Sequence, residues 1–138
     1  MFVLGFPLLL IPFAIYNIVA FILRMPDEFW TAQATAVHMM SGQEWKLTWE
    51  DILLAFAILL LAVEIIKSTR IGVRAIVDHV LAMALFVVTL VEFLLVQRAG
   101  TSTFFLLTTT CLVDVLVGFI VSIRGSQRQV EIEAERPA

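Results

Sequence analysis

Four long apolar runs, separated by short polar segments, dominate the pattern of hydrophobic and polar positions along this chain. The runs cover residues 2–23, 48–67, 71–97 and 101–123. A helix needs about 20 apolar residues to cross a hydrocarbon core of about 30 Å, and each run meets that length. The pattern therefore predicts an all-α, polytopic integral membrane protein, with four transmembrane helices in an antiparallel bundle over residues 1–124.

The overall composition favours the same class of protein. Hydrophobic residues make up 61% of the 138 residues and charged residues only 15%, a balance far from that of soluble proteins. The first run lacks the basic start and the small-residue cleavage site of a secretory signal peptide. The net charge of −3 implies no particular partner, and the sequence has no basic patch that would indicate nucleic-acid binding.

The external loop 25–49, between the first two runs, carries a pattern of its own. Pro26-Asp27-Glu28 has the composition of a helix start, and Ser41-Gly42 that of a helix stop. At helical spacing one face is shared by Phe29, Gln33, Ala36, Val37 and Met40. We therefore expect a short amphipathic helix that lies on the external membrane surface.

The end of this loop predicts the entry into the second span. Trp45, Leu47 and Trp49 alternate with polar residues, which is typical of an extended stretch. Thr48 and Asp51 have the spacing of a capping box. Tryptophan is enriched at membrane interfaces, so the expected interfacial anchors are Trp30, Trp45 and Trp49. The loop's Trp and Met residues form a possible contact surface for a partner.

The basic residues predict the orientation, because Lys and Arg gather in cytoplasmic loops. With the N-terminus inside, the cytoplasmic set is Lys67, Arg70, Arg74, Arg124, Arg128 and Arg136. The external set is smaller and consists of Arg24, Lys46 and Arg98. We therefore expect both termini in the cytoplasm, with residues 125–138 as a polar cytoplasmic tail.

Carboxylates interrupt three of the apolar runs and are the main candidates for a specific function. An ionised carboxylate at a helix centre costs about 2.5–3.5 kcal/mol on insertion scales, so such groups face other helices, water or a partner. Helical spacing places Asp78, Leu85, Thr89 and Glu92 on one stripe of the third run. A stripe of the fourth run holds Thr103, Thr110, Asp114, Gly118 and Ser122. The intramembrane polar candidates are Asp114, Glu92, Asp78, His79, Glu64, Thr89 and Thr110.

Three functions are compatible with these candidates. In the first, the stripes are packing contacts of a small non-catalytic subunit or scaffold, which oligomerises or associates with a larger membrane complex. Asp114 would then clamp to the Thr89 stripe, with further pairs Lys67–Glu64 and Arg74–Asp78. In the second, the carboxylates and His79 form a proton or cation pathway. In the third, Asp78 and His79 act as the acid–base pair of a lipid- or quinone-acting membrane enzyme.

The sequence predicts no metal site and no cofactor. His79 is the only histidine within a run, His38 lies outside the runs, and Cys111 has no second cysteine to join it. The sequence contains no nucleophile elbow, no HExxH, no glycine-rich phosphate loop and no CxxC. We therefore expect that the chain is not an enzyme by itself, and that its surroundings are the lipid bilayer and other membrane subunits.

Several short segments in the second half of the chain support a resemblance. They are Val91-Glu92-Phe93-Leu94-Leu95-Val96, Thr101-Ser102-Thr103-Phe104-Phe105, Val113-Asp114-Val115 and Val121-Ser122-Ile123-Arg124. With these segments the chain resembles uncharacterised small four-span inner-membrane proteins of alphaproteobacteria. The resemblance implies a bacterial inner (cytoplasmic) membrane and no known activity, and it assigns no role to individual residues.

Overall fold

Helices make up most of the chain, which confirms the predicted all-α class in its main feature. The structure, a computed structural model, describes residues 6–68 and 73–135. Its long helices are α1 (Leu10–Asn17), α2 (Trp49–Ser68), α3 (Val73–Leu95) and α4 (Ser102–Glu135). The shorter elements are η2 (Ile18–Ile22), η3 (Asp27–Phe29), η4 (Gln97–Ala99), β1 (Gln33–His38) and β2 (Glu44–Thr48).

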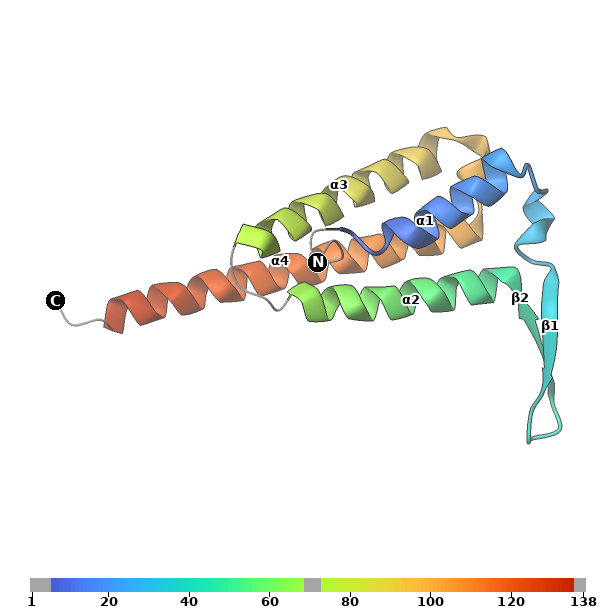
Figure 1. Cartoon of the computed structure of the whole chain (residues 1–138), viewed down its shortest axis with the longest axis horizontal. Coiled ribbons are helices and arrows are strands. Elements are labelled where there is room, and N and C mark those ends of the chain that lie inside the picture. Colours follow the sequence, from blue (N-terminus) through green and yellow to red (C-terminus); the bar gives the residue numbers. More distant parts are fainter. Residues whose placement is uncertain (1–5, 69–72, 136–138) are drawn as a thin grey trace.

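The long helices lie side by side along the long axis of the molecule and alternate in direction from one to the next (Figure 1). α4 packs against both α3 and α2, which contact each other much less than either contacts α4. α1, continued by the π-helical turn η2, packs against α2 and α4. The connection between α2 and α3 includes residues 69–72, which lie outside the described residues.

Two of the described helices are long and apolar enough to cross a membrane, over Ile76–Leu95 and Ser102–Arg124. The sequence predicted four such spans, so the other two need a correction. The apolar part of the first, Leu10–Ile22, starts after Pro7 and has 13 residues, about 20 Å at 1.5 Å per residue. That length is well below the thickness of a hydrocarbon core.

α2 occupies nearly the predicted residues but fails the same test because of its charges. Glu50 and Asp51 lie in its first turn, and Glu64 and Lys67 in its last turns. The uninterrupted apolar stretch between them, residues 52–63, is about 18 Å long. α2 is therefore long enough to be a membrane span, and it is the charged residues at its ends that distinguish it from α3 and α4.

Two apolar clusters fill the interior of the bundle. The larger lies at the end where the strands emerge and is built around Tyr16, Trp30, Leu53, Phe104 and Leu107. Tyr16 stacks on Trp30 with ring centroids 5.0 Å apart, and Phe104 meets the edge of the Tyr16 ring. The smaller cluster, further along the bundle, consists of Leu9, Leu85 and Cys111 with partly buried leucine and phenylalanine around them.

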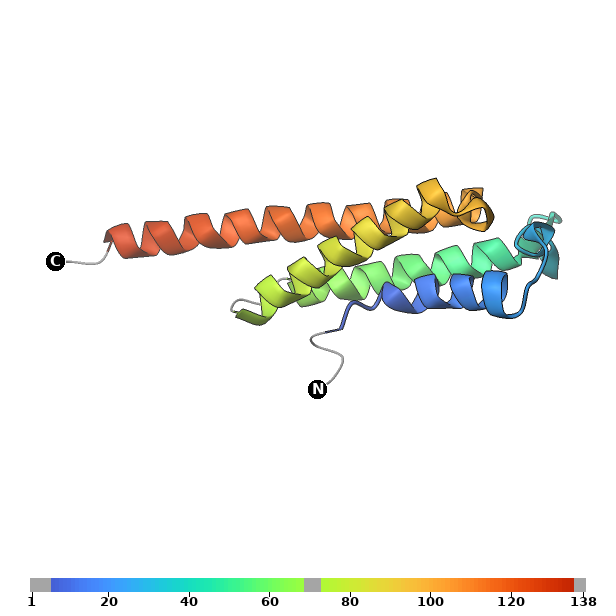
Figure 2. The same cartoon turned by 90° about the horizontal axis from the view of Figure 1, so that it is seen from above.

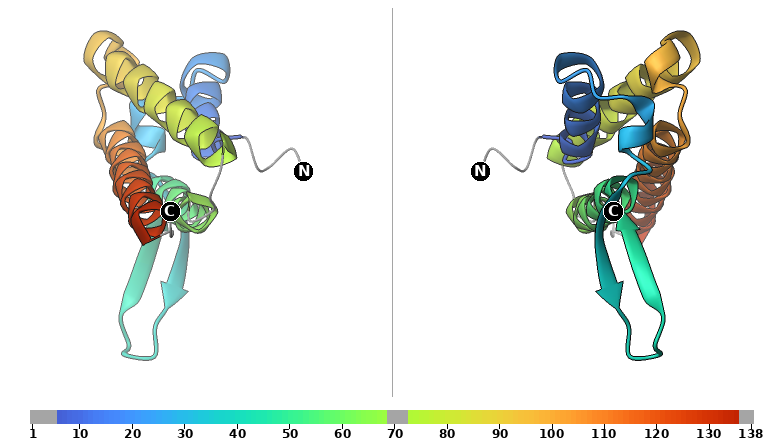
Figure 3. Two further views of the ribbon diagram at one scale, coloured as in Figure 1. Left: turned by 90° about the vertical axis from the view of Figure 1, so that its left-hand side faces the viewer. Right: turned by 90° about the vertical axis from the view of Figure 1, so that its right-hand side faces the viewer.

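A β-hairpin replaces the amphipathic helix that the sequence predicted for the external loop. Only Asp27–Phe29 is helical there, as a single 3-10 turn, and β1 then pairs antiparallel with β2. Figure 3, viewed along the bundle, shows the hairpin projecting sideways from the helices. The predicted extended stretch is confirmed for Trp45 to Thr48, which lie in β2, whereas Trp49 is the first residue of α2.

The reason for the wrong helix prediction is that Ser41-Gly42 can end a helix or make a hairpin turn. Gly42 has φ of +87°, a conformation that glycine adopts without steric cost, and its amide donates to the Met39 carbonyl. A single extended segment leaves its backbone groups without partners, so β2 needs a second strand. β1 is that second strand. Its Thr35 pairs with Leu47, and its Val37 pairs with Trp45.

The start of α2 agrees with the predicted capping box. Asp51 Oδ2 accepts hydrogen bonds from the Thr48 amide at 3.0 Å and from its hydroxyl at 2.8 Å. The Asp51 amide in turn donates to Thr48 Oγ1 at 3.2 Å. These reciprocal bonds satisfy amides that an uncapped helix start would leave free.

The C-terminal segment is helical, because α4 continues through Arg124 to Glu135. This end of α4 extends past the other helices (Figure 2). The strand-like alternation Val130-Glu131-Ile132-Glu133 lies within the helix. Glu and Ala are good helix formers, and a helix already under way adds residues at little cost, whereas a strand here would need a partner.

Candidate functional site

Several of the predicted polar candidates meet in a small pocket between α2, α3 and α4. Its polar lining comes from Glu64, Ser68, Asp78, His79 and Asp114, with Gly118 beside them. The pocket has a volume of about 20 Å³, which is room for about one water molecule. The sequence therefore identified four of its polar side chains but could not show that they come together.

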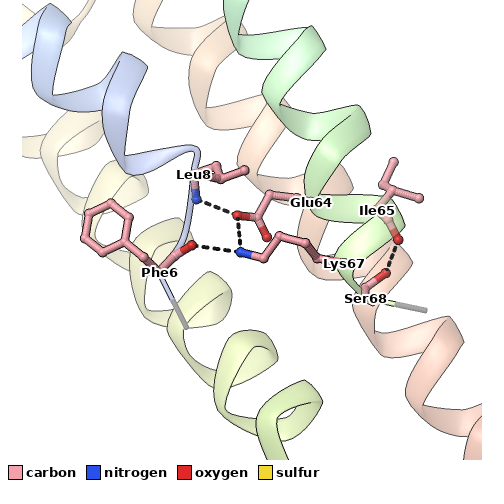
Figure 4. A network of polar contacts seen from close by, with 6 residues as sticks. All are labelled: Phe6, Leu8, Glu64, Ile65, Lys67 and Ser68. Carbon is pink, nitrogen blue, oxygen red and sulfur yellow. Dashed lines mark hydrogen bonds and ion pairs between the residues drawn. The ribbon is translucent and has the colours of Figure 1, made fainter. Parts of the chain in front are cut away.

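Glu64 and Lys67 join α2 to the segment that precedes α1 (Figure 4). Lys67 Nζ lies 3.3 Å from Glu64 Oε1, which confirms the predicted pair, and it also donates to the Phe6 carbonyl at 3.0 Å. Glu64 Oε1 accepts a hydrogen bond from the Leu8 amide. Both side chains are more than nine-tenths buried, so the ion pair is part of the interior.

Asp114 faces the pocket from α4 and is only 7% exposed. It lies within electrostatic range of Glu64, Lys67 and Asp78. Two neighbouring atoms on α3, Asp78 Oδ1 and His79 Nδ1, are buried and have no hydrogen-bond partner among the described residues. The predicted pair of Asp78 with Arg74 involves a side chain that lies outside the described part of the chain.

His79 rests directly on the backbone of α4 at Gly118. A Cβ atom at residue 118 would lie 2.6 Å from His79 Nδ1, far inside van der Waals contact. The imidazole ring also contacts Phe119, with ring centroids 6.5 Å apart. Gly118 therefore allows α3 and α4 to approach at the level of the pocket, as small residues do between membrane helices.

Glu92, the remaining carboxylate among the predicted candidates, lies in a different part of the bundle. Its Oε2 accepts a hydrogen bond from Asn17 Nδ2 at 3.5 Å, which connects α3 to α1. Tyr16, next to Asn17, donates its hydroxyl to the Arg98 carbonyl at 3.0 Å and lies 2.7 Å from Thr101 Oγ1. These contacts tie the loop between α3 and α4 to α1, a role that the sequence analysis did not assign to Tyr16.

An apolar layer lies between Glu92 and the pocket. It is the smaller cluster of Leu9, Leu85 and Cys111. Thr89 is fully buried beside this layer, next to Cys111, and donates its hydroxyl to the Phe86 carbonyl at 2.9 Å. Asp114 meets the Thr89 stripe at its Asp78 end, where both line the pocket, while Cys111, nearly one turn earlier on α4, lies beside Thr89 itself.

The hydroxyl groups of α4 bond to their own helix rather than across to its neighbours. Thr110 donates to the Leu106 carbonyl at 2.8 Å, and Ser122 to the Gly118 carbonyl at 2.8 Å. Back-bonding to the preceding turn is a common alternative for Ser and Thr within helices. The predicted stripe is right as a packing face for Thr103, Thr110, Asp114 and Gly118, which are buried, but not for Ser122, which is exposed.

The three predicted tryptophan anchors do not form one group. Trp30 is 5% exposed and belongs to the larger apolar cluster, so its assignment to the interface is wrong. Trp45 and Trp49 are exposed, as an interfacial position requires, and Trp49 stacks on Phe29 with centroids 5.6 Å apart. The close spacing of Tyr16 and Trp30 depends on the path of the loop, which local pattern does not reveal.

Among the described residues, no three His, Cys, Asp or Glu side chains converge closely enough to hold a metal ion. No known protein family, curated protein or solved structure matches the chain. The resemblance to alphaproteobacterial membrane proteins therefore stays a hypothesis, and function has to be argued from the residues themselves.

Proposed function

We propose that the chain is a small non-catalytic subunit or scaffold of a bacterial inner membrane, with four membrane-inserted helices and both termini in the cytoplasm. The distribution of side chains supports the membrane location. Glu64, Lys67 and Asp114 are buried, whereas large apolar residues are exposed along all four long helices. Only 17% and 33% of the two candidate spans are buried inside the structure, unlike core helices of a soluble protein.

The short helices also fit this location when their polar ends are taken into account. The Glu64–Lys67 pair removes net charge from the end of α2, and Glu50 and Asp51 lie at its start, where headgroups and water can solvate them. A short hydrophobic stretch is accommodated by local thinning of the bilayer. We therefore retain α1 and α2 as membrane-inserted helices, with Trp45 and Trp49 in the interface.

The surface that carries the scaffold proposal is the outer face of α4, which we call the α4 stripe. Its positions follow each other at alternating steps of three and four residues: Val113, Leu116, Ile120, Ile123, Gln127, Val130 and Ala134. All are exposed, and they lie opposite the buried face formed by Phe104, Leu107 and Cys111. This spacing is the a/d pattern of a two-stranded coiled coil, with one polar residue at an a position.

The partner we propose for the α4 stripe is a second copy of this chain. Two copies inserted in the same orientation present parallel α4 helices, as a symmetric coiled coil requires. The tail of α4 extends about 16 Å beyond Arg124 at 1.5 Å per residue, and helical segments of this length are marginal in water without packing. The two polar stripes predicted from sequence are not available for this contact, because they face the interior of the bundle. They are the stripe from Asp78 to Glu92 on α3 and the stripe that contains Asp114 on α4.

Cysteine cross-linking tests this dimer directly. With Val130→Cys, we expect an oxidant to convert most of the purified protein into a disulfide-linked dimer, because symmetric coiled-coil core positions bring Cα atoms within disulfide range. Ile132→Cys is the matched control, since Ile132 is similarly exposed but lies off the α4 stripe. The native Cys111 is buried and should not react. Equal cross-linking at both positions, or none at either, would count against the proposed dimer.

A proton or cation pathway is the second candidate, favoured by the buried carboxylates around the pocket. The apolar layer of Leu9, Leu85 and Cys111 argues against a continuous relay to Glu92. A lipid- or quinone-acting enzyme is less well supported, because the pocket beside Asp78 and His79 has room for about one water and not for a headgroup.

Proton flux into liposomes separates the scaffold from the pathway. For a scaffold we expect the wild type and Asp114→Asn to conduct no more than protein-free liposomes, while both keep the same mass in detergent. Asparagine retains the size of the side chain but cannot carry a proton. Flux in the wild type that disappears in Asp114→Asn at unchanged mass would favour the pathway instead.

A further inference from the structure

The charges around the pocket do not balance among the described side chains. Glu64, Asp78 and Asp114 bring three carboxylates, while Lys67 is the cation within range of them. Lys67 is already committed to Glu64 and to the Phe6 carbonyl. A buried carboxylate without a compensating charge is costly, and among the described side chains Asp114 has no cation of its own.

The unused hydrogen-bonding atoms point to the same place. Asp114 is nine-tenths buried, lines the pocket, and has no hydrogen bond to another described residue. Asp78 Oδ1 and His79 Nδ1 are buried without partners in the described structure. Orphaned buried atoms of this kind are rare, because each costs about 1–3 kcal/mol.

We infer that this pocket is a proton-binding site, in which Asp114 holds a proton that one bridging water shares with Asp78 and His79. The proton neutralises the buried Asp114 carboxylate, and the protonated carboxyl gains a donor for the acceptors around it. The volume of about 20 Å³ fits one water, whose two to four hydrogen bonds are available from these three side chains. The inference is independent of the α4 dimer.

The site exchanges protons with one side of the membrane only. Ser68, the last residue of α2, lines the pocket, which places it toward the end of the bundle from which the tail of α4 extends. On the other side the apolar layer of Leu9, Leu85 and Cys111 separates it from Glu92. In the proposed topology the accessible side is the cytoplasm, so the site responds to cytoplasmic pH without carrying protons across.

Infrared spectroscopy of the full chain in nanodiscs at neutral pH tests the site. Exposed carboxyl groups are ionised at that pH, so a protonated carboxyl stretch reports a buried acid. We expect one such band in the wild type, its loss in Asp114→Asn, and its retention in Glu92→Gln, the matched control at the other end of the bundle. Labelling all aspartates with carboxyl ¹³C should shift the band in the unmodified chain, so the test does not rely on folding of a variant.

Defined results would overturn the inference. Absence of the band in the wild type would show that the pocket holds no proton at neutral pH. A band that does not move with labelled aspartate would assign the proton to a glutamate. A band that is present in choline chloride and disappears in sodium chloride would identify sodium as the cation that the pocket prefers. None of these results depends on cross-linking at Val130, so the site and the dimer can fail separately.

Discussion

Replacing Glu64 by alanine is expected to destabilise the bundle by about 3–5 kcal/mol, the cost of leaving a buried charge without its partner. Lys67 would retain only the Phe6 carbonyl as an acceptor, and the Leu8 amide would lose its carboxylate. Both side chains of the pair are buried, so the lost partner is not simply replaced by bulk water. The free energy of unfolding in mixed micelles, followed by circular dichroism, measures the effect.

The double variant Glu64→Ala with Lys67→Met is the control for this prediction. Removing both charges leaves no uncompensated ion, and methionine keeps much of the packing of the lysine stem. We therefore expect the double variant to be more stable than the single one. If it were as unstable as Glu64→Ala alone, the loss would come from packing and not from the unpaired charge.

Substituting Gly118 by alanine should cost about 1–3 kcal/mol, the usual range for overpacking a close interior contact. The new methyl group would lie 2.6 Å from His79 Nδ1, and the imidazole ring also contacts Phe119, the next residue on α4. α3 and α4 must separate or His79 must leave the pocket. The measurement is again the free energy of unfolding in mixed micelles.

A double-mutant cycle with His79→Ala tests the cause. Alanine at residue 79 removes the ring that meets the new methyl group, so Gly118→Ala should be much less harmful in that background. The coupling energy between the two residues is expected to be about 1 kcal/mol or more, as for other contacting pairs. Additive effects would mean that the glycine matters for another reason.

Sequence pattern predicted what depends on local composition. The spans of α3 and α4, the Thr48–Asp51 capping box and the Glu64–Lys67 pair all follow from hydropathy or from residues three or four positions apart. The inward direction of Thr89 and Asp114 also follows from helical periodicity. These features need no knowledge of which helices become neighbours.

The wrong predictions concern which segments of the chain pack or pair with each other. Residues 33–38 were predicted as helix because their spacing fits one, and only pairing with β2 makes them a strand. The interior register of α3 and α4 places Cys111 beside Thr89 and Asp114 at the Asp78 end of the same stripe, and nothing in either helix alone fixes that register. The pocket was beyond prediction for the same reason, since its residues come from three helices.

The continuity of α4 gives the molecule a mechanical property. Asp114 and Glu135 belong to one helix without proline, about 32 Å apart at 1.5 Å per residue. Sharp kinks in helices occur at proline, at Gly/Ser pairs and at π-bulges, and Gly125-Ser126 is such a pair at the start of the tail. The part of α4 before this pair is packed against α2 and α3, whereas the tail extends beyond them. A bend at Gly125-Ser126 would therefore change the direction of the tail without disturbing the buried side chains around Asp114.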